Sequence, residues 1–233
     1  GIGFATAKRI AEEGGHVALT GRNPKRLEEA KASLPEKTIV LQNDAADPEA
    51  AKILAATVKD EMGGIDHLFL NAGHGIVAGT TDNNAELYDS MMDANVKGPV
   101  LQMAELAPMI TDKGSVVLTA SVVEYLGFGT GGIYAVSKAA LTTLARSFAA
   151  DLAPRGIRVN SVAPGPIETG FFDSTGMSEE EMEGFAQHVL QSLPLGRFGK
   201  AEEVAAVVTF LLSDDASYVT GSQYMVDGGM TMR

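Results

Sequence analysis

The sequence of 233 residues contains no cysteine, which excludes disulfides and thiolate metal sites. The absence of cysteine also favours a reducing, cytoplasmic location. The four histidines lack the HExxH motif and other ligand spacings, so a zinc site is not expected. We interpret them as surface or loop residues: His16, His67, His74 and His188.

An excess of basic residues is also lacking, because the formal net charge is −12. Phosphate backbones select basic surfaces, so this charge argues against a nucleic-acid partner and against an anionic membrane surface. Its simplest role is solubility. No stretch approaches 18 uninterrupted apolar residues, so the sequence predicts no membrane-spanning helix. No secretory signal is visible at the start, where the first residue is Gly1.

Helix and strand patterns alternate along the chain. Apolar runs predict strands at 16–20, 38–42, 65–70, 115–120, 157–162 and 223–226. The intervening patterns predict helices at 4–14, 24–33, 47–62, 85–110, 133–152, 178–191 and 201–212, with a break at Gly98-Pro99. Such alternation is typical of a parallel sheet with helices on both faces. We therefore predict a single α/β domain over 1–233 with a doubly wound, Rossmann-like sheet.

Ligands of doubly wound sheets bind beyond the carboxyl ends of the strands. The candidate binding segments all follow predicted strands: Gly21-Arg22, Asp44, Asn71-Ala72-Gly73, Ser121 and Pro164-Gly165. Their common position predicts one site at this edge of the sheet.

The segment Tyr134-Ala135-Val136-Ser137-Lys138 places a phenol and an ammonium one helical turn apart on one face. A free tyrosine has a pKa near ~10 and is a poor base at neutral pH. A nearby cation favours the phenolate and is expected to lower that pKa. With Ser121 at the end of a predicted strand, the pattern predicts a proton-transfer site. The alternative is a surface tyrosine and lysine that lie four residues apart.

Ser121, Tyr134 and Lys138 at this spacing resemble the active site of the short-chain dehydrogenase/reductase family, and Asn95 fits its fourth position. The resemblance implies a ketoreductase that transfers a hydride between nicotinamide and a secondary alcohol or ketone. Ser121 would donate to the substrate oxygen, Tyr134 would exchange a proton with it, and Lys138 would bind the nicotinamide ribose. Asn95 would hold a water that links Lys138 to solvent. The alternative for Asn95 is a polar helix face.

Gly1-Ile2-Gly3 opens the first predicted helix, where free N–H groups favour a pyrophosphate. It matches the GIG of the family pattern TGxxxGIG. The first glycine and the strand before it are missing from the sequence, and that strand would be central in the sheet. We expect the working protein to be longer, because an unpaired central edge is unfavourable.

The resemblance also addresses the choice of cofactor. NAD-dependent relatives carry an acid after the second strand of the fold, where this chain has Gly21 followed by Arg22. A guanidinium there favours NADP(H) over NAD(H). The alternative is that Arg22 is a solvated loop charge.

Further cofactor contacts are implied by the resemblance. Asp44 and Ala45 would meet adenine, Asn71-Ala72-Gly73 would lie along adenosine, Pro164-Gly165 would pack on nicotinamide, and Ile167 and Thr169 would bind its carboxamide. For Asp44 a loop or helix-cap role is the alternative. For Asn71-Ala72-Gly73 the alternative is a plain turn.

Residues 170–195 are expected to form a substrate lid. Val123, Tyr125 and Phe128 are expected to line the pocket, with Glu124 facing solvent. Relatives assemble through the helices that carry Asn95 and Tyr134, so we expect a homotetramer or homodimer. Other functions left open are an NAD(H)-dependent dehydrogenase, a nucleotide-binding regulatory protein of weak activity, and an isomerase or dehydratase, although relatives of that last kind are longer.

Overall fold

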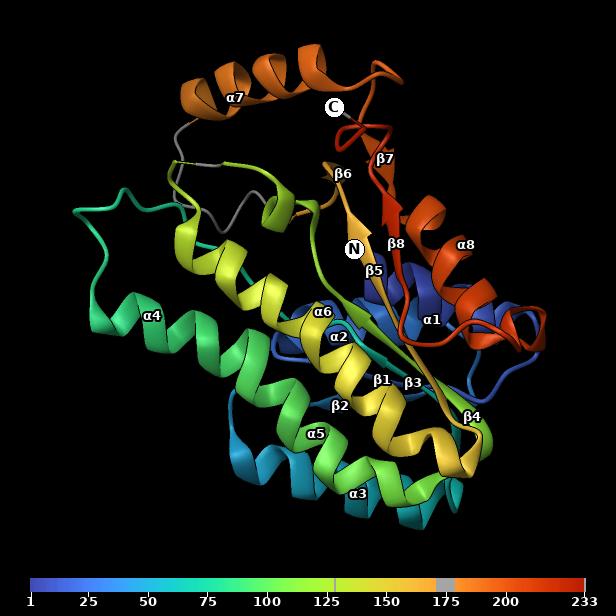
Figure 1. Cartoon of the computed structure of the whole chain (residues 1–233). Helices are drawn as coiled ribbons and strands as arrows, with labels where there is room; N and C mark the ends of the chain where they lie inside the picture. Colours follow the sequence, from blue (N-terminus) through green and yellow to red (C-terminus); the bar gives the residue numbers. More distant parts are fainter. Residues whose placement is uncertain (128, 171–178, 233) are drawn as a thin grey trace.

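The computed structural model describes residues 1–127, 129–170 and 179–232. Every strand pairing among these residues is parallel. The strands are β1 (Ala18–Gly21), β2 (Ile39–Gln42), β3 (Ile65–Leu70), β4 (Ile110–Thr119), β5 (Arg158–Pro164), β6 (Ile167–Glu168), β7 (Gly199–Lys200) and β8 (Gln223–Val226). Helices connect them, so the predicted parallel α/β fold is confirmed (Figure 1).

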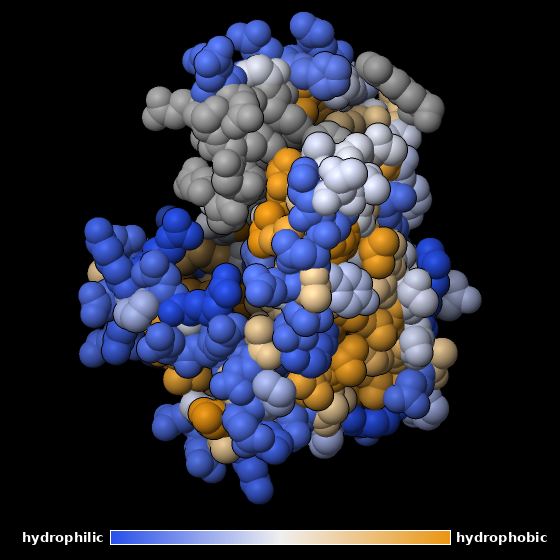
Figure 2. Space-filling view, turned by 90° about the vertical axis from the view of Figure 1, so that its left-hand side faces the viewer, coloured by the Kyte–Doolittle hydropathy of each residue, from blue (hydrophilic) through white to orange (hydrophobic). Residues whose placement is uncertain are grey.

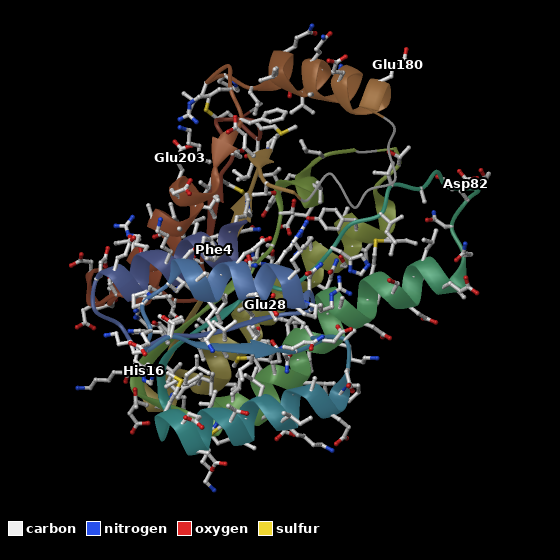
Figure 3. The ribbon with its side chains drawn as sticks, turned by 180° about the vertical axis from the view of Figure 1, so that it is seen from behind. Phe4, His16, Glu28, Asp82, Glu180 and Glu203 are labelled. Atoms are coloured by element: carbon white, nitrogen blue, oxygen red, sulfur yellow. The ribbon has the colours of Figure 1, made fainter. Side chains whose placement is uncertain are left out.

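Two layers of helices enclose the sheet. The helices are α1 (Ile2–Glu12), α2 (Pro24–Ser33), α3 (Pro48–Met62), α4 (Ala85–Met92), α5 (Gly98–Leu106), α6 (Gly132–Leu152), α7 (Glu179–Ser192) and α8 (Ala201–Leu212). Helices α4, α5 and α6 lie on the near side in Figure 1. Seen from behind, α1 with Phe4 lies in front (Figure 3).

The alternation of side chains along β4 builds a core on both faces. Val116 and Leu118 pack with Leu141 of α6, whereas Val117 packs with Ala5 of α1 and with residues of α8. Successive side chains of a strand point to opposite faces, which explains the division. Val116, Val117 and Leu118 are completely buried, and each such side chain contributes about 1.5–3 kcal/mol. The core therefore holds β4, and with it Ser121, rigidly at the centre of the molecule.

The sheet is interrupted between β1 and β3. One sheet has the order β1-β2 and a second has the order β3-β4-β5-β8. The facing edges of β1 and β3 line a cavity of about 660 Å³.

Helix starts follow from local side chains. The carboxamide of Asn23 caps α2, the carboxylate of Asp47 caps α3 and the carboxamide of Asn84 caps α4. At the other end of α3, Gly63 adopts a left-handed conformation with φ 72°, which glycine accepts without strain.

The bend or break predicted at Gly98-Pro99 corresponds to a helical irregularity that lies directly before Gly98. The irregularity is the π-helical segment η1 (Asp93–Lys97), and α5 begins directly at Gly98. Gly98 serves close packing instead, since a Cβ there would lie 2.4 Å from the carbonyl oxygen of Ala45. Proline at the second position of a helix needs no N–H partner, so Pro99 does not disturb α5.

Two further elements differ from the prediction. The short strands β6 and β7 pair with each other and are too brief for a hydrophobic period to reveal.

Within the described ranges, no helix is both long and apolar enough to cross a membrane.

Candidate active site

The four residues of the predicted proton-transfer site converge at the carboxyl end of β4. Ser121 follows β4 and precedes the 3₁₀ segment η3 (Val122–Tyr125), while Tyr134 and Lys138 lie on the first turns of α6. Asn95 lies in η1, which contacts α6. The structure therefore brings together side chains that are 43 positions apart in the sequence, from 95 to 138.

Ser121 and Tyr134 are directly linked. The Ser121 side chain hydrogen-bonds the Tyr134 hydroxyl group. Ser121 itself is only 7% exposed, and its Oγ accepts a hydrogen bond of 3.3 Å from the backbone N–H of Val123. One hydroxyl is thus held against a phenol at a site that a carbonyl or alcohol oxygen can share.

The expected depression of the Tyr134 pKa is wrong for this structure. Burial raises the pKa of Tyr134 to about 12, and the hydrogen bond from Ser121 opposes that rise only in part. Removing water from a phenolate is unfavourable, which explains the rise. The Lys138 Nζ lies 5.9 Å from the centroid of the Tyr134 ring, close enough for a cation–π contact.

Lys138 is itself buried, at 4% exposure. Its Nζ donates a hydrogen bond of 2.9 Å to the backbone carbonyl oxygen of Thr119 at the end of β4. Burial lowers the pKa of Lys138 from 10.5 to about 8. The ammonium is therefore the dominant form at neutral pH and loses its proton within reach of mildly alkaline conditions.

Asn95 is completely buried, so the alternative of a polar, exposed helix face is wrong. Its Nδ2 donates to the backbone carbonyl oxygen of His74 at 2.8 Å and to Ser137 Oγ at 2.9 Å. Its Oδ1 accepts from the backbone N–H of His74 at 2.9 Å. Ser137 Oγ in turn donates to the carbonyl oxygen of Tyr134 at 2.8 Å. Asn95 thus reaches the start of α6 through Ser137.

His74 lies in a loop and the His67 residue of β3 is exposed, so both have the expected surface or loop position. His74 follows Gly73 at the site; burial, Arg22 and Lys138 together lower its pKa. His67 lies inside β3, with Nδ1 2.8 Å from Ser115 Oγ, and burial lowers its pKa as well. No metal or nucleophile pattern marks either position in the sequence. The only available signal was the position of His74 directly after Asn71-Ala72-Gly73.

Gly73 allows the backbone to approach the reactive side chains. A Cβ at this position would lie 2.8 Å from Asn95 Oδ1 and 3.2 Å from Lys138 Nζ. The first distance is too short for any real side chain, so glycine is required here. The neighbouring Asn71 is fixed separately, because its Oδ1 accepts a hydrogen bond of 3.1 Å from Thr119 Oγ1.

The start of α1 fits an anionic ligand. Gly1 is the N-cap, and in the part of the chain described here α1 has neither a capping side chain nor an acidic residue in its first turn. A helix start of this kind favours phosphate groups. A Cβ at Gly3 would lie 2.8 Å from Asn71 Nδ2, and one at Gly1 would lie 3.7 Å from Thr169. Gly3 therefore lies against Asn71, and Gly1 lies against Thr169.

The predicted adenosine contacts lie on exposed loops. Arg22 is exposed, and its carbonyl oxygen accepts a hydrogen bond of 3.2 Å from Gln42 Nε2. Asp44 is also exposed, but its Oδ1 accepts a hydrogen bond of 3.0 Å from the backbone N–H of Ala46. That bond favours the loop alternative for one oxygen of Asp44. Ala45 is partly buried, with its carbonyl oxygen packed against Gly98.

The predicted nicotinamide segment is braced by the last strand. The Gly165 N–H donates to the carbonyl oxygen of Val226 at 3.0 Å, and a Cβ at Gly165 would lie 2.7 Å from the Asp227 Cα. Pro164 ends β5 and is buried. The side chain of Ile167 is 6% exposed and packs in the core, so only its backbone is free to serve a cofactor.

The substrate side is described in part. Residues 171–178 of the predicted lid and the predicted pocket residue Phe128 lie outside the described residues. Tyr125 is 52% exposed beside Ser121, and Val123 is partly buried. The expectation that Glu124 faces solvent is wrong, because its carboxylate binds Thr142 and Gln223.

Together these residues fit a dinucleotide: an uncapped helix start, glycines at close approaches and an exposed guanidinium. Among residues 1–127, 129–170 and 179–232, no group of three or more His, Cys, Asp or Glu side chains is arranged to hold a metal ion. The polar groups at the end of β4 include the Ser121 and Tyr134 hydroxyls and the Lys138 ammonium, which can each act on a substrate oxygen.

Comparison with known proteins gives one consistent result. Residues 1–231 match the family model described as "Enoyl-(Acyl carrier protein) reductase". The chain is 37% identical to dehydrogenase/reductase SDR family member 4 of Oryctolagus cuniculus, covering 100% of this chain and 90% of that protein. It is 35% identical to the glucose 1-dehydrogenase of Gluconobacter oxydans, covering 100% and 88%.

A solved structure agrees. A short-chain dehydrogenase/reductase from Serratia marcescens superposes with a TM-score of 0.91 at 33% identity, covering 99% of this chain and 94% of that one. The likeness extends over nearly all of both chains.

Proposed function

Because the chain belongs to the short-chain dehydrogenase/reductase family of oxidoreductases, we propose that it interconverts a secondary alcohol and a ketone with NADP(H). The observation that carries the proposal is the hydrogen bond between Ser121 and the Tyr134 hydroxyl, with Lys138 buried one turn further along α6. Hydroxyl, phenol and ammonium are the set that holds an oxygen atom and moves a proton to or from it.

Each residue has a separate part in this proposal. Ser121 Oγ donates to the substrate oxygen and fixes its position. Tyr134 keeps its proton at neutral pH, because burial raises its pKa to about 12, and it is therefore set to protonate the oxygen of a ketone. Lys138 supplies a positive charge that stabilises the phenolate left behind. Asn95 holds the His74 backbone and Ser137 around this pair.

The cofactor would be held along the carboxyl ends of β1 to β5. Gly1, Ile2 and Gly3 would receive the pyrophosphate at the start of α1, and the adenosine would pass Asp44, Ala45 and the Asn71-Ala72-Gly73 turn. A bound nicotinamide would supply or accept the hydride. Pro164, Gly165, Ile167 and Thr169 would orient it, together with Lys138.

Arg22 supports NADP(H) over NAD(H) in this proposal. It is an exposed cation after β1, and it acts on the pKa of His74 together with Lys138, so it lies near the same site. A guanidinium binds a phosphate through paired, charge-assisted hydrogen bonds.

A substrate panel tests the function. Purified protein is incubated with NADPH or NADH and with simple ketones, a β-ketoacyl thioester and sugar lactones, while the loss of reduced nicotinamide absorbance is followed. The reverse reaction uses secondary alcohols and glucose. We expect turnover with at least one ketone and a preference for NADPH. Cofactor binding without turnover on the whole panel would favour a nucleotide-binding regulatory protein instead.

We also propose that 1–233 acts as one domain with a lid near 170–195, and that copies assemble as a homotetramer or homodimer. Large apolar side chains are exposed on the α4, α5 and α6 side: Tyr88 at 48%, Val100 at 37% and Val136 at 58%. Figure 2 shows one face of the molecule, where apolar side chains reach the surface between hydrophilic regions. Light scattering of the purified protein measures the number of copies in the assembly.

We also propose a cytoplasmic location, because the sequence contains no cysteine.

A further inference from the structure

A closed hydrogen-bond network involves η3, the segment that follows Ser121 in the chain. Thr142 Oγ1 donates to Glu124 Oε2 at 2.9 Å, and Gln223 Nε2 donates to Glu124 Oε1 at 3.0 Å and to Thr142 Oγ1 at 3.0 Å. The Tyr125 hydroxyl donates to Gln223 Oε1. We call Glu124, Thr142 and Gln223, with Tyr125, the Glu124 network.

The direction of every bond in the Glu124 network is fixed by chemistry. An ionised carboxylate only accepts, and both Glu124 oxygens are used. The two hydrogens of the Gln223 amide point to Glu124 and Thr142, which leaves its oxygen for Tyr125. A satisfied network of this kind specifies one arrangement, because turning the Gln223 amide over would set its oxygen, an acceptor, against a Glu124 oxygen.

The network joins three elements that build the active site. Glu124 and Tyr125 belong to η3, which begins directly after Ser121. Thr142 continues the row of Tyr134 and Lys138 along α6 at intervals of four residues, so it lies on the same helical face. Gln223 starts β8, whose last residue, Val226, precedes the Asp227 that packs on Gly165.

The contact of Ser121 with η3 transmits this restraint. Ser121 Oγ accepts a hydrogen bond from the Val123 N–H at 3.3 Å, and Val123 directly precedes Glu124 in the chain. If η3 shifts relative to α6, Ser121 Oγ shifts relative to the Tyr134 hydroxyl. Misplacement by about 1 Å is enough to slow a reaction by about 10²-fold.

We propose that Glu124 is a positioning residue that holds the Ser121 hydroxyl in register with Tyr134 and Lys138, through Thr142 and Gln223. This inference rests on the proposed function, since it assigns a role within the same site. Glu124 touches neither reacting atom in the arrangement described; it acts through Ser121.

The first test uses Glu124→Gln, which sets an amide N–H against the Thr142 hydroxyl or the Gln223 amide. With NADPH and the best ketone of the panel, kcat should fall by about tenfold to hundredfold, while the dissociation constant of NADPH changes by less than about twofold. Thr142→Val, which keeps the side-chain shape, should reproduce the loss. Glu203→Gln is the matched control, because Glu203, labelled in Figure 3, lies in the first turn of α8, pairs with Arg197 and belongs to none of the site segments.

Two double variants separate positioning from general stability. Glu124→Gln with Gln223→Glu exchanges the two side-chain groups and should recover most of kcat, because the new amide at position 124 can then donate to the carboxylate at position 223 and accept from Thr142. In a Ser121→Ala background, Glu124→Gln should change kcat by less than about twofold, since both act through one hydroxyl. The proposal is overturned if Glu124→Gln has the kcat of the wild type. It is also overturned if Glu124→Gln lowers kcat as much in the Ser121→Ala background as in the wild type.

A readout independent of turnover distinguishes this proposal from the proposed function. Hydrogen exchange of the Val123 and Leu126 amides should be faster in Glu124→Gln than in the wild type, while the amides of β4 stay unchanged. If no ketone is turned over, the proposed function fails and this measurement still tests the network. Unchanged exchange at both amides would show that Glu124 does not restrain η3.

Discussion

Asn95 and the backbone of His74 exchange two hydrogen bonds. Asn95 Nδ2 donates to the His74 carbonyl oxygen at 2.8 Å, and Asn95 Oδ1 accepts from the His74 N–H at 2.9 Å. The pair ties the turn after β3 to η1, which lies between α4 and α5. Asn95 is completely buried, so bulk solvent does not reach its side chain. An apolar residue there would leave the His74 amide and carbonyl without partners.

The first prediction concerns this pair. Asn95→Ala should lower the free energy of unfolding by about 2–4 kcal/mol, because each buried group left unpaired is unfavourable by about 1–3 kcal/mol. Urea denaturation measures the change. Asn84→Ala is the control, since Asn84 only caps α4 and its loss should lower stability by about 1 kcal/mol. Equal losses for the two variants would contradict the role given to Asn95.

The second prediction concerns the phenol. Tyr134→Phe should lower kcat by about 10²–10⁴-fold, because the substrate oxygen loses its proton donor. NADPH binding, followed by nicotinamide fluorescence, should be nearly unchanged. Tyr218→Phe is the control, because Tyr218 is fully exposed and belongs to none of the site segments. Turnover retained by Tyr134→Phe would remove Tyr134 from the mechanism.

The third prediction concerns the cofactor phosphate. Arg22→Ala should weaken NADP(H) binding by about tenfold to hundredfold, the equivalent of losing about 1.5–3 kcal/mol of charge-assisted hydrogen bonding. NAD(H), which lacks the 2′-phosphate, should bind almost as before. Titration calorimetry with both cofactors measures the difference, with Arg9→Ala on the exposed face of α1 as control. A similar loss for both cofactors would reject the assignment of Arg22.

The fourth prediction concerns Lys138 and pH. Burial lowers its pKa to about 8 in the folded protein, from the ordinary value of 10.5 that the unfolded chain retains. Below pH 8 both states hold the proton, and the folded state then carries an unfavourable buried ammonium, at roughly 3 kcal/mol for the shift. As the pH rises from 8 to 10.5, the folded state releases its proton first and this destabilisation is relieved.

Lys138→Met should therefore unfold at higher urea concentration than the wild type at pH 7, and the difference should shrink between pH 8 and 10.5. Catalytic activity should fall over the same alkaline range in the wild type, because the cation beside Tyr134 is lost. Lys59→Met, on the exposed face of α3, is the control for removing one exposed lysine. A pH-independent difference for Lys138→Met would show that its ammonium is not destabilised by burial.

Hydrophobic pattern and turn residues predicted the fold well where the signals are local. The strand Ile65–Leu70, the helix Ala201–Leu212 and the strand Gln223–Val226 have the predicted bounds. Local hydrophobic patterns decide these elements within a few residues of sequence, and a local cap such as Asp47 marks the start of α3 in the same way. The grouping of Ser121, Tyr134 and Lys138 was equally predictable, because strand ends of a parallel sheet meet at one edge.

Features set by tertiary contacts were not predictable. The π-helical segment η1 arises where the Asn95 side chain bonds the His74 backbone and Ser137, and no local signal marks those partners. Glu124 faces inward because Gln223, far along the chain, supplies its donor. The pKa of Tyr134 depends on how much water the fold removes, which spacing does not report.

The site has no space for a methyl group at Gly73. A single added carbon would meet Asn95 Oδ1 at 2.8 Å and Lys138 Nζ at 3.2 Å, acting as a wedge between the turn after β3 and the two side chains that face it. The backbone of Gly73 is therefore packed directly against side chains of the active site, with no space for a side chain of its own. A substitution at position 73 would therefore displace Asn95 and Lys138 together.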